Sequence, residues 1–172
     1  MRLVVDTDAL VKLTLAGAKE AVVRAFEVLI PEAVYREAVV EGKAHGYEDA
    51  LVLERNVQAR RIRVVDAGDE PFEAEDALPD GGEREVYRLF QRVGAGGSLA
   101  FIVSDDQRLL RRLALLGIRA ITPGAVLVLL AREGAARVAD AVGWLEAMRR
   151  TISAAEYELC RSALAALKRE EG

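Results

Sequence analysis

Two pairs of acidic residues follow apolar runs in this sequence. Asp6 and Asp8 come directly after an apolar run in VVDTD, and Asp105 and Asp106 follow another in IVSDD. Like charges gathered where buried strands end cost electrostatic energy unless a cation joins them. Oxygen ligands favour Mg²⁺ or Mn²⁺, and a chain with one histidine and one cysteine is nearly excluded from binding zinc.

Further acids accompany these two pairs. Glu37 lies in the middle of a helical segment, VYREAVVEG, and Glu83 opens another, GEREVYRL, with Glu85 just beyond it. A carboxylate cluster that holds one or two divalent metals is suited to phosphodiester hydrolysis, because the metal lowers the pKa of a water molecule. If the acids converge, the sequence predicts a metal-dependent site of this kind.

Each acid alone also has a structural explanation. Asp8, Asp105 or Asp106 would serve as a helix N-cap, and Glu83 in a first helical turn would complement the helix dipole. Glu37 would then be a solvated helix residue. The joint pattern favours the metal site over these separate explanations.

The elements that must position these acids alternate between strands and helices. Short apolar runs at residues 3–6, 28–30, 62–65, 100–103 and 118–121 are separated by helical segments, which predicts an α/β fold with a parallel sheet covered on both faces. Ligands bind at the carboxyl ends of such strands. We expect a single domain over residues 1–172, with an α/β core (1–133) and a C-terminal helical extension (134–172).

Local signals place several element boundaries. Pro31 should begin a helix that Gly42 ends, and Ser153 with Glu156 has the form of a capping box. The acidic segment 68–82 reads as a loop.

Composition limits the function further. The chain has 172 residues, 52% of them hydrophobic, and a net charge of −4. Because the whole protein is not basic, any binding to nucleic acid must use a local positive patch. Its single cysteine, Cys160, cannot form a disulfide within the chain, which suits a reducing compartment. No apolar run is long enough to span a bilayer. We therefore expect a cytoplasmic protein that does not bind membranes.

The segments VVDTDALVKL, PEAVYREAVVEG, GEREVYRLF and IVSDDQRLLRRLALLGIRAITPGAVLVLL resemble, in order and spacing, the motifs of the PIN-domain family of metal-dependent ribonucleases, including VapC-like prokaryotic members. The resemblance implies a PIN-like three-layer α/β/α fold with extra C-terminal helices. It also implies cleavage of single-stranded RNA with Mg²⁺ or Mn²⁺. Many such members are toxins that a small antitoxin neutralises, and many form homodimers.

The resemblance also implies which acids bind the metal. Asp6 matches the family's first ligand, Glu37 the second, and Glu83 the third, with Glu85 as its alternative. The fourth ligand is Asp106 or Asp105, and Asp8 stands where the family often has a neutral residue, as an extra ligand or a helix cap.

Arginines beside these motifs are candidates for holding RNA phosphates. Arg84 and Arg88 flank the third motif, and Arg108, Arg111 and Arg112 lie in the helical segment after Asp106. A salt-bridged helix surface explains them equally well.

Two other functions compete with the ribonuclease. Asp6-Thr7-Asp8 resembles the nucleophile motif of haloacid-dehalogenase-type phosphatases, with Asp6 as nucleophile, but that chemistry needs a cation for the phosphate. No lysine lies in the segment just before Asp105, where that family places it. The second alternative is a non-catalytic PIN-like scaffold that binds RNA or protein.

Overall fold

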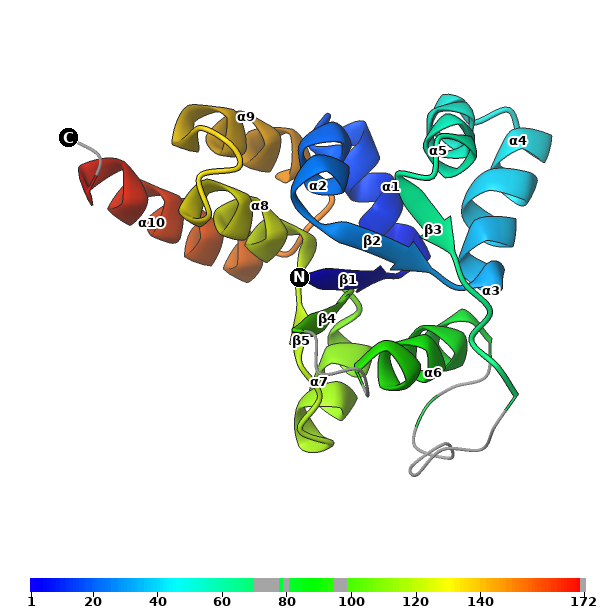
Figure 1. The fold of residues 1–172 in the computed structure, drawn as a ribbon. Coiled ribbons are helices and arrows are strands. Elements are labelled where there is room, and N and C mark those ends of the chain that lie inside the picture. Colours follow the sequence, from blue (N-terminus) through cyan, green and yellow to red (C-terminus); the bar gives the residue numbers. More distant parts are fainter. Residues whose placement is uncertain (70–77, 79–80, 95–98, 171–172) are drawn as a thin grey trace.

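A five-stranded sheet forms the centre of the protein. The computed structural model describes residues 1–69, 78, 81–94 and 99–170, and its five strands are all parallel, in the order β3-β2-β1-β4-β5 (Figure 1). The strands are β1 (Arg2–Val5), β2 (Glu27–Ile30), β3 (Ile62–Val64), β4 (Ala100–Val103) and β5 (Ala120–Ile121). The predicted α/β fold with a parallel central sheet is confirmed.

The central strand is buried on both faces, which explains its unbroken apolar run. Leu3, Val4 and Val5 have no exposed surface. Leu3 pairs with Val28 on one side and with Phe101 on the other. Because all five strands run the same way, the residues that follow β1 and β4 meet at one edge of the sheet.

Helices cover both faces of the sheet (Figure 1). One layer holds α6 and α7, and the other holds α1, α2, α5 and α8, with α9 and α10 packed outside α8. The helices are α1 (Thr7–Leu15), α2 (Lys19–Ala25), α3 (Glu32–Tyr35), η1 (Arg36–Glu41), α4 (Gly42–Ala44), α5 (Glu48–Gln58), α6 (Gly82–Gly94), α7 (Gln107–Leu115), α8 (Pro123–Arg132), α9 (Val138–Met148) and α10 (Ala154–Glu170).

The two C-terminal helices share the main core, since Leu145, Met148 and Leu164 belong to the same buried cluster as the sheet residues.

The Ser153 Oγ accepts a hydrogen bond from Glu156 N (3.1 Å), as the capping-box motif predicts. The Glu156 carboxylate, however, accepts a hydrogen bond from Gly124 N (2.8 Å) in the first turn of α8. The acid therefore joins α10 to α8.

The helix that begins after Pro31 differs from the prediction. Residues Arg36–Glu41 form a π-helix, and the helical path continues through Gly42 to Ala44, so the predicted end at Gly42 is wrong. Gly42 has helical dihedral angles, and a Cβ at this position would lie 3.0 Å from the Cβ of Ala50. Here the missing side chain permits close packing of α5 and does not end the helix. Most of the predicted loop 68–82 lies outside the described residues.

Candidate active site

An acidic hollow of about 270 Å³ lies at the carboxyl ends of β1 and β4. The sequence-predicted acids reach it from segments far apart in the chain: the start of α1, the π-helix, the start of α6 and the β4–α7 connection. Its lining residues are Asp6, Thr7, Asp8, Val34, Glu37, Gly82, Glu83, Asp105 and Asp106. Six carboxylates therefore share one small cavity.

Asp6 is the most deeply embedded of these acids. Its carboxylate caps α1 by accepting a hydrogen bond from Ala9 N (2.8 Å). Burial raises the pKa of the Asp6 carboxyl to about 7. The charges of Asp105 and Asp8 raise this pKa further, whereas hydrogen bonds from the Ser104 hydroxyl and from Ala9 N lower it. The N-cap role considered for Asp8 belongs to Asp6, and Asp8 lies in the first turn of α1, exposed at the hollow.

The neighbouring acids after β4 have different surroundings. Asp106 caps α7, where its Oδ1 accepts hydrogen bonds from Arg108 N (2.6 Å) and Leu109 N (2.9 Å). Asp105 instead forms an ion pair through its Oδ2 with the Nζ of Lys12, which projects from α1. Asp106 therefore has one oxygen without a partner among these contacts, whereas Asp105 is held by a cation.

Glu37 reaches the hollow from the π-helix. Its Oε2 accepts a hydrogen bond from the Thr7 hydroxyl (2.7 Å). π-Helical turns are rare and concentrate at functional sites. The hydrogen bond joins the π-helix to the start of α1, beside Asp6.

Glu83 and Glu85, the two alternatives for the third ligand, point to different places. Glu83 lines the hollow, where burial raises the pKa of its carboxyl, the charge of Asp106 adds to the rise, and Arg112 opposes it. Glu85 does not line the hollow, and its Oε2 accepts a hydrogen bond from Ala33 N (3.0 Å) at the start of α3. This geometry favours Glu83 as the acid that faces a ligand.

The predicted RNA-binding arginines also separate into two groups. Arg84 donates a hydrogen bond to the carbonyl of Leu78 (3.2 Å), and Arg88 to that of Gly68 (3.5 Å). These two side chains therefore bond to backbone carbonyls of residues that precede α6. The arginine side chains of α7 are exposed, and the charge of Arg112 lowers the pKa of Glu83. The exposed group comprises Arg108, Arg111 and Arg112.

Three residues that sequence reasoning did not place at the site contact its acids: Thr7, Lys12 and Ser104. Lys12 is four residues after Asp8 on the same helix, a spacing that indicates a shared face. Ser104 directly precedes Asp105 and is completely buried. A polar residue at the end of a buried strand was the available signal for Ser104.

The donor chemistry of the hollow fits a hard divalent cation, because each ionisable side chain that lines it in the described part of the chain is a carboxylate. Burial, with a smaller contribution from neighbouring acids, raises the pKa of the Asp6 and Glu83 carboxyls, so a cation at the hollow would favour their charged forms. Within the described residues, no three histidine, cysteine, aspartate or glutamate side chains form a ready metal-binding group.

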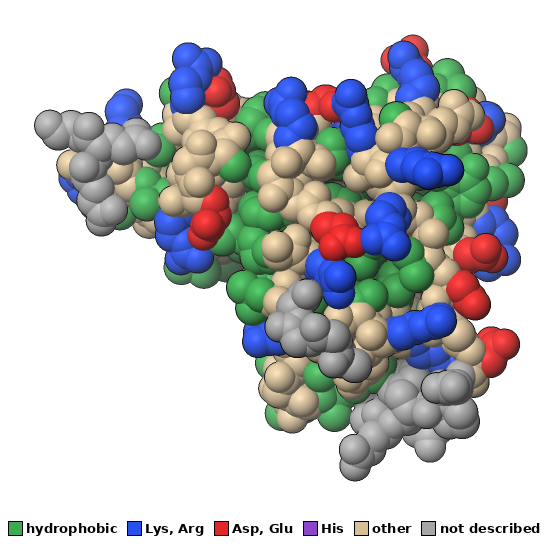
Figure 2. All heavy atoms as spheres, viewed as in Figure 1, with side chains coloured by type: hydrophobic (Ala, Val, Ile, Leu, Met, Phe, Trp, Pro, Cys, Tyr) green, Lys and Arg blue, Asp and Glu red, His purple; other side chains and the backbone are tan. Residues whose placement is uncertain are grey.

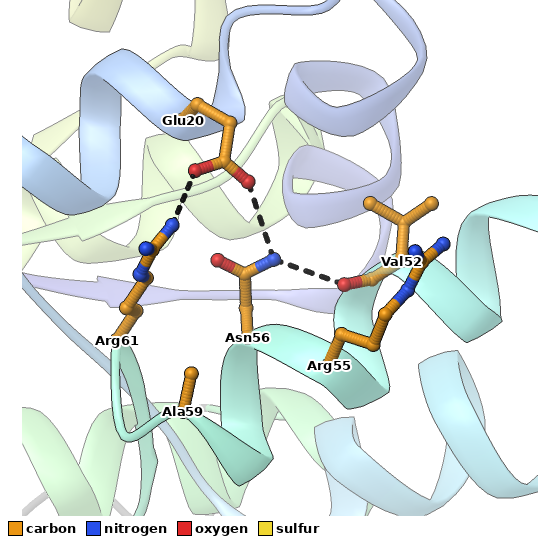
Figure 3. Close-up of a pocket in the computed structure, with 6 residues that line it drawn as sticks. All are labelled: Glu20, Val52, Arg55, Asn56, Ala59 and Arg61. Carbon is orange, nitrogen blue, oxygen red and sulfur yellow. Dashed lines mark hydrogen bonds and ion pairs between the residues drawn. The ribbon is translucent and has the colours of Figure 1, made fainter.

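A second polar hollow, of about 330 Å³, lies where α5 ends and β3 begins (Figure 3). The Glu20 carboxylate lines this hollow and accepts a hydrogen bond from Arg61 (2.9 Å) and a long one from Asn56 (3.4 Å). Lys19 forms an ion pair with the same carboxylate (2.9 Å). The hydrogen bond and charge of Lys19 lower the pKa of Glu20, with smaller contributions from Asn56 and Arg61. The negative charge of Glu20 is therefore already balanced by Lys19 and Arg61.

The surface of the protein shows no extended basic field on the face seen in Figure 2, where lysine and arginine side chains are scattered and several have acidic neighbours. Any contact with a polyanion on that face would therefore be local. In the part of the chain that the structure describes, no helix combines the length and apolar character needed to cross a membrane.

Comparison with known proteins agrees with the fold. A family model described as a PIN domain matches residues 2–169, which include the C-terminal helices. No match was found among curated proteins or among solved structures. PIN domains are generally nucleases and typically depend on divalent metals. The chain belongs to the PIN-domain family.

Proposed function

We propose that this protein is a Mg²⁺- or Mn²⁺-dependent endoribonuclease that hydrolyses phosphodiester bonds of single-stranded RNA in the acidic hollow. The observation that carries the proposal is the convergence of six carboxylates in one cavity at the carboxyl edge of the sheet. Such a cluster is unfavourable by itself and becomes favourable when a divalent cation binds.

Four acids are the proposed metal-holding and catalytic residues: Asp6, Glu37, Glu83 and Asp106. A divalent cation in this hollow would supply Lewis-acid stabilisation of the charge that develops at the phosphate. Asp6 and Asp106 are fixed because each also caps a helix. Ser104 positions both, since its hydroxyl donates to Asp6 and its Oγ accepts a hydrogen bond from Asp106 N (3.1 Å).

RNA would approach along α7. Arg108, Arg111 and Arg112 are exposed on this helix, which begins at the hollow. Guanidinium groups there can neutralise phosphates on either side of the cleaved bond.

The decisive experiment measures cleavage of a fluorescent single-stranded RNA with Mn²⁺, with Mg²⁺ and with a chelator. We expect cleavage only with metal, and loss of cleavage in Asp6→Asn, whose amide is as good a helix cap as the carboxylate. Glu20→Gln, in the second polar hollow, is the matched control and should cleave normally. If Asp6→Asn retains full Mn²⁺ binding and RNA cleavage, the proposal is wrong.

One observation keeps a phosphatase under consideration as the second function. The sequence has no lysine just before Asp105, but the fold brings Lys12 from α1 to that carboxylate. A phosphatase with Asp6 as nucleophile would release phosphate from a small ester and form an acid-stable, base-labile aspartyl-phosphate. The family match favours the nuclease, and a radiolabelled phosphate transfer assay distinguishes the two.

We also propose a toxin role with an antitoxin partner and a homodimer, on the ground of the sequence resemblance to VapC-like PIN proteins. A short reading frame immediately upstream, encoding a DNA-binding protein that co-purifies with this chain, would support the toxin role. Sedimentation that shows only monomer at micromolar concentration would contradict the dimer.

A further inference from the structure

Lys12 forms an ion pair with Asp105, one of the acids that line the acidic hollow. It projects from α1 and contacts Asp105, which follows β4. Only 18% of the lysine side chain and 14% of the aspartate side chain are exposed. An ion pair this deeply placed is screened little by salt, and removing one partner leaves a charge in a poorly solvated position.

Three other acids of the hollow accept hydrogen bonds from neutral donors. Asp6 accepts from Ala9 N and Ser104, Glu37 accepts from the Thr7 hydroxyl, and Asp106 accepts from backbone N–H groups. Among ion pairs between described residues, the pair formed by Lys12 is the one that reaches the hollow. Among the described residues, Lys12 therefore supplies the positive charge that is bonded directly to an acid of the hollow.

We propose that Lys12 is a built-in counter-ion of the acidic hollow. It holds Asp105 away from the metal and stabilises the metal-free protein. Its positive charge also weakens metal binding, because it offsets part of the negative potential of the hollow. Lys12 is thus a positioning residue. The inference rests on the proposed function and deepens it, because it divides the adjacent acids after β4 into a metal-facing Asp106 and a lysine-facing Asp105.

Charge balance gives the expected direction of each effect. With Lys12 present, one carboxylate is already neutralised, so the folded chain tolerates the cavity without metal. Without the lysine ammonium, the same carboxylates repel one another more strongly and attract a divalent cation more strongly. A purely structural ion pair would change stability but would not tighten metal binding.

The test compares Lys12→Met with wild type in two measurements. Calorimetric titration with Mn²⁺ should give binding roughly tenfold tighter in the variant, the order expected when a unit charge near a divalent ion is removed. Thermal unfolding in chelator should show a lower Tm for the variant, and saturating Mn²⁺ should raise its Tm more than that of wild type. Lys43→Met, which breaks an ion pair with Glu54 away from the hollow (2.6 Å), is the control and should leave Mn²⁺ affinity unchanged.

The double variant Lys12→Met/Asp105→Asn decides whether Asp105 is a ligand. It restores the net charge of the cavity, so we expect Mn²⁺ affinity within about threefold of wild type and recovery of most of the lost Tm. Mn²⁺ binding more than about tenfold weaker than wild type would show that Asp105 binds the metal and would overturn the inference. Unchanged Mn²⁺ affinity in Lys12→Met would overturn it too.

These outcomes are separate from those of the proposed function. Wild-type protein that binds no Mn²⁺ or cuts no RNA rejects the nuclease proposal. Wild-type protein that does both, beside a Lys12→Met variant with no gain in affinity, rejects only the role of Lys12.

Discussion

The two polar hollows of this protein treat their carboxylates in opposite ways. At the amino end of β3, Glu20 is surrounded by Lys19, Arg61 and Asn56, and the pKa of its carboxyl is lowered. At the carboxyl ends of β1 and β4, burial and neighbouring acids raise the pKa of Asp6 to about 7. The first arrangement stabilises the fold without help, whereas the second leaves negative charge for a ligand to neutralise.

The contrast separates acids that serve the structure from acids available for chemistry. A carboxylate with bound cations lowers its own free energy as soon as the chain folds. A carboxylate that is buried beside others raises the free energy of the empty protein, which natural proteins accept mainly at functional sites. Four predictions test this division, from the largest expected effect to the smallest.

The largest effect is expected from a matched pair of substitutions on α6. Glu83→Gln removes an acid that faces the acidic hollow, so RNA cleavage with Mn²⁺ should fall by at least about 100-fold, the upper range for loss of even an outer-shell partner of a metal. Glu85→Gln should keep cleavage within a few-fold and change stability by less than about 1 kcal/mol, because its amide oxygen can still accept the hydrogen bond from Ala33 N. Initial rates and urea unfolding measure both. Equal losses of cleavage in the two variants would contradict the assignment of Glu83, and not Glu85, to the acidic hollow.

The second prediction concerns the pH dependence of the metal-free protein. The pKa of Asp6 is higher in the folded chain than in the unfolded chain, so the folded state binds the proton more tightly. The corresponding stability is present below about pH 4 and is lost as the pH rises towards 7. Asp6→Asn removes this loss and should make the metal-free protein more stable than wild type at about pH 8, by on the order of 2 to 4 kcal/mol.

Urea unfolding in chelator at about pH 4 and about pH 8 measures this effect on either side of the Asp6 titration. The difference between Asp6→Asn and wild type should be small at the lower pH, where Asp6 is largely protonated in the folded state and half-protonated in the unfolded state. A variant that is less stable than wild type at the higher pH would contradict the raised pKa of Asp6.

The third prediction concerns Ser104, whose hydroxyl donates to Asp6. Ser104→Ala removes a donor that favours the charged carboxylate, so the pKa of Asp6 should rise further and stability at about pH 8 should fall by about 1 kcal/mol. NMR titration of the labelled aspartate carboxyl carbons follows the pKa directly. Ser104→Cys, a similar size with a weaker donor, should fall between alanine and wild type.

The smallest effect is expected at Glu20. Its pKa is lowered by folding, so its contribution to stability is present above the unfolded pKa and is lost as the pH falls. The Glu20 side chain is 45% exposed, so Glu20→Gln should cost less than about 1 kcal/mol at about pH 8 and less still at about pH 3. RNA cleavage should be unchanged. A loss of cleavage would mean that the second polar hollow takes part in function.

Sequence alone predicted the sheet and the group of acids, because both depend on short-range patterns. An apolar run such as Leu3-Val4-Val5 marks a buried strand wherever it lies, and parallel strands bring the following acids to one edge. Contacts between distant segments follow from no such pattern. The ion pair of Lys12 with Asp105 and the hydrogen bond that Ala33 N donates to the Glu85 carboxylate can be seen only in the fold.

The π-helix escaped prediction for a related reason. The segment after Pro31 has ordinary helical residues, and the choice between α- and π-helical hydrogen bonds at Arg36–Glu41 depends on what packs against it. It contacts α3, α4, α5 and α1. Side-chain patterns within one segment carry little information about that packing.

The position of β1 in the middle of the sheet has a consequence for the synthesis of the protein. Leu3 pairs with Val28, which is nearby in the chain, and also with Phe101, which a ribosome adds much later. Pairings between distant residues form slowly because a long loop must close first. Asp6 and Glu37 therefore meet Asp106 only after the intervening segments have been synthesised and folded, so a nascent chain that ends before Asp106 carries no complete acidic hollow.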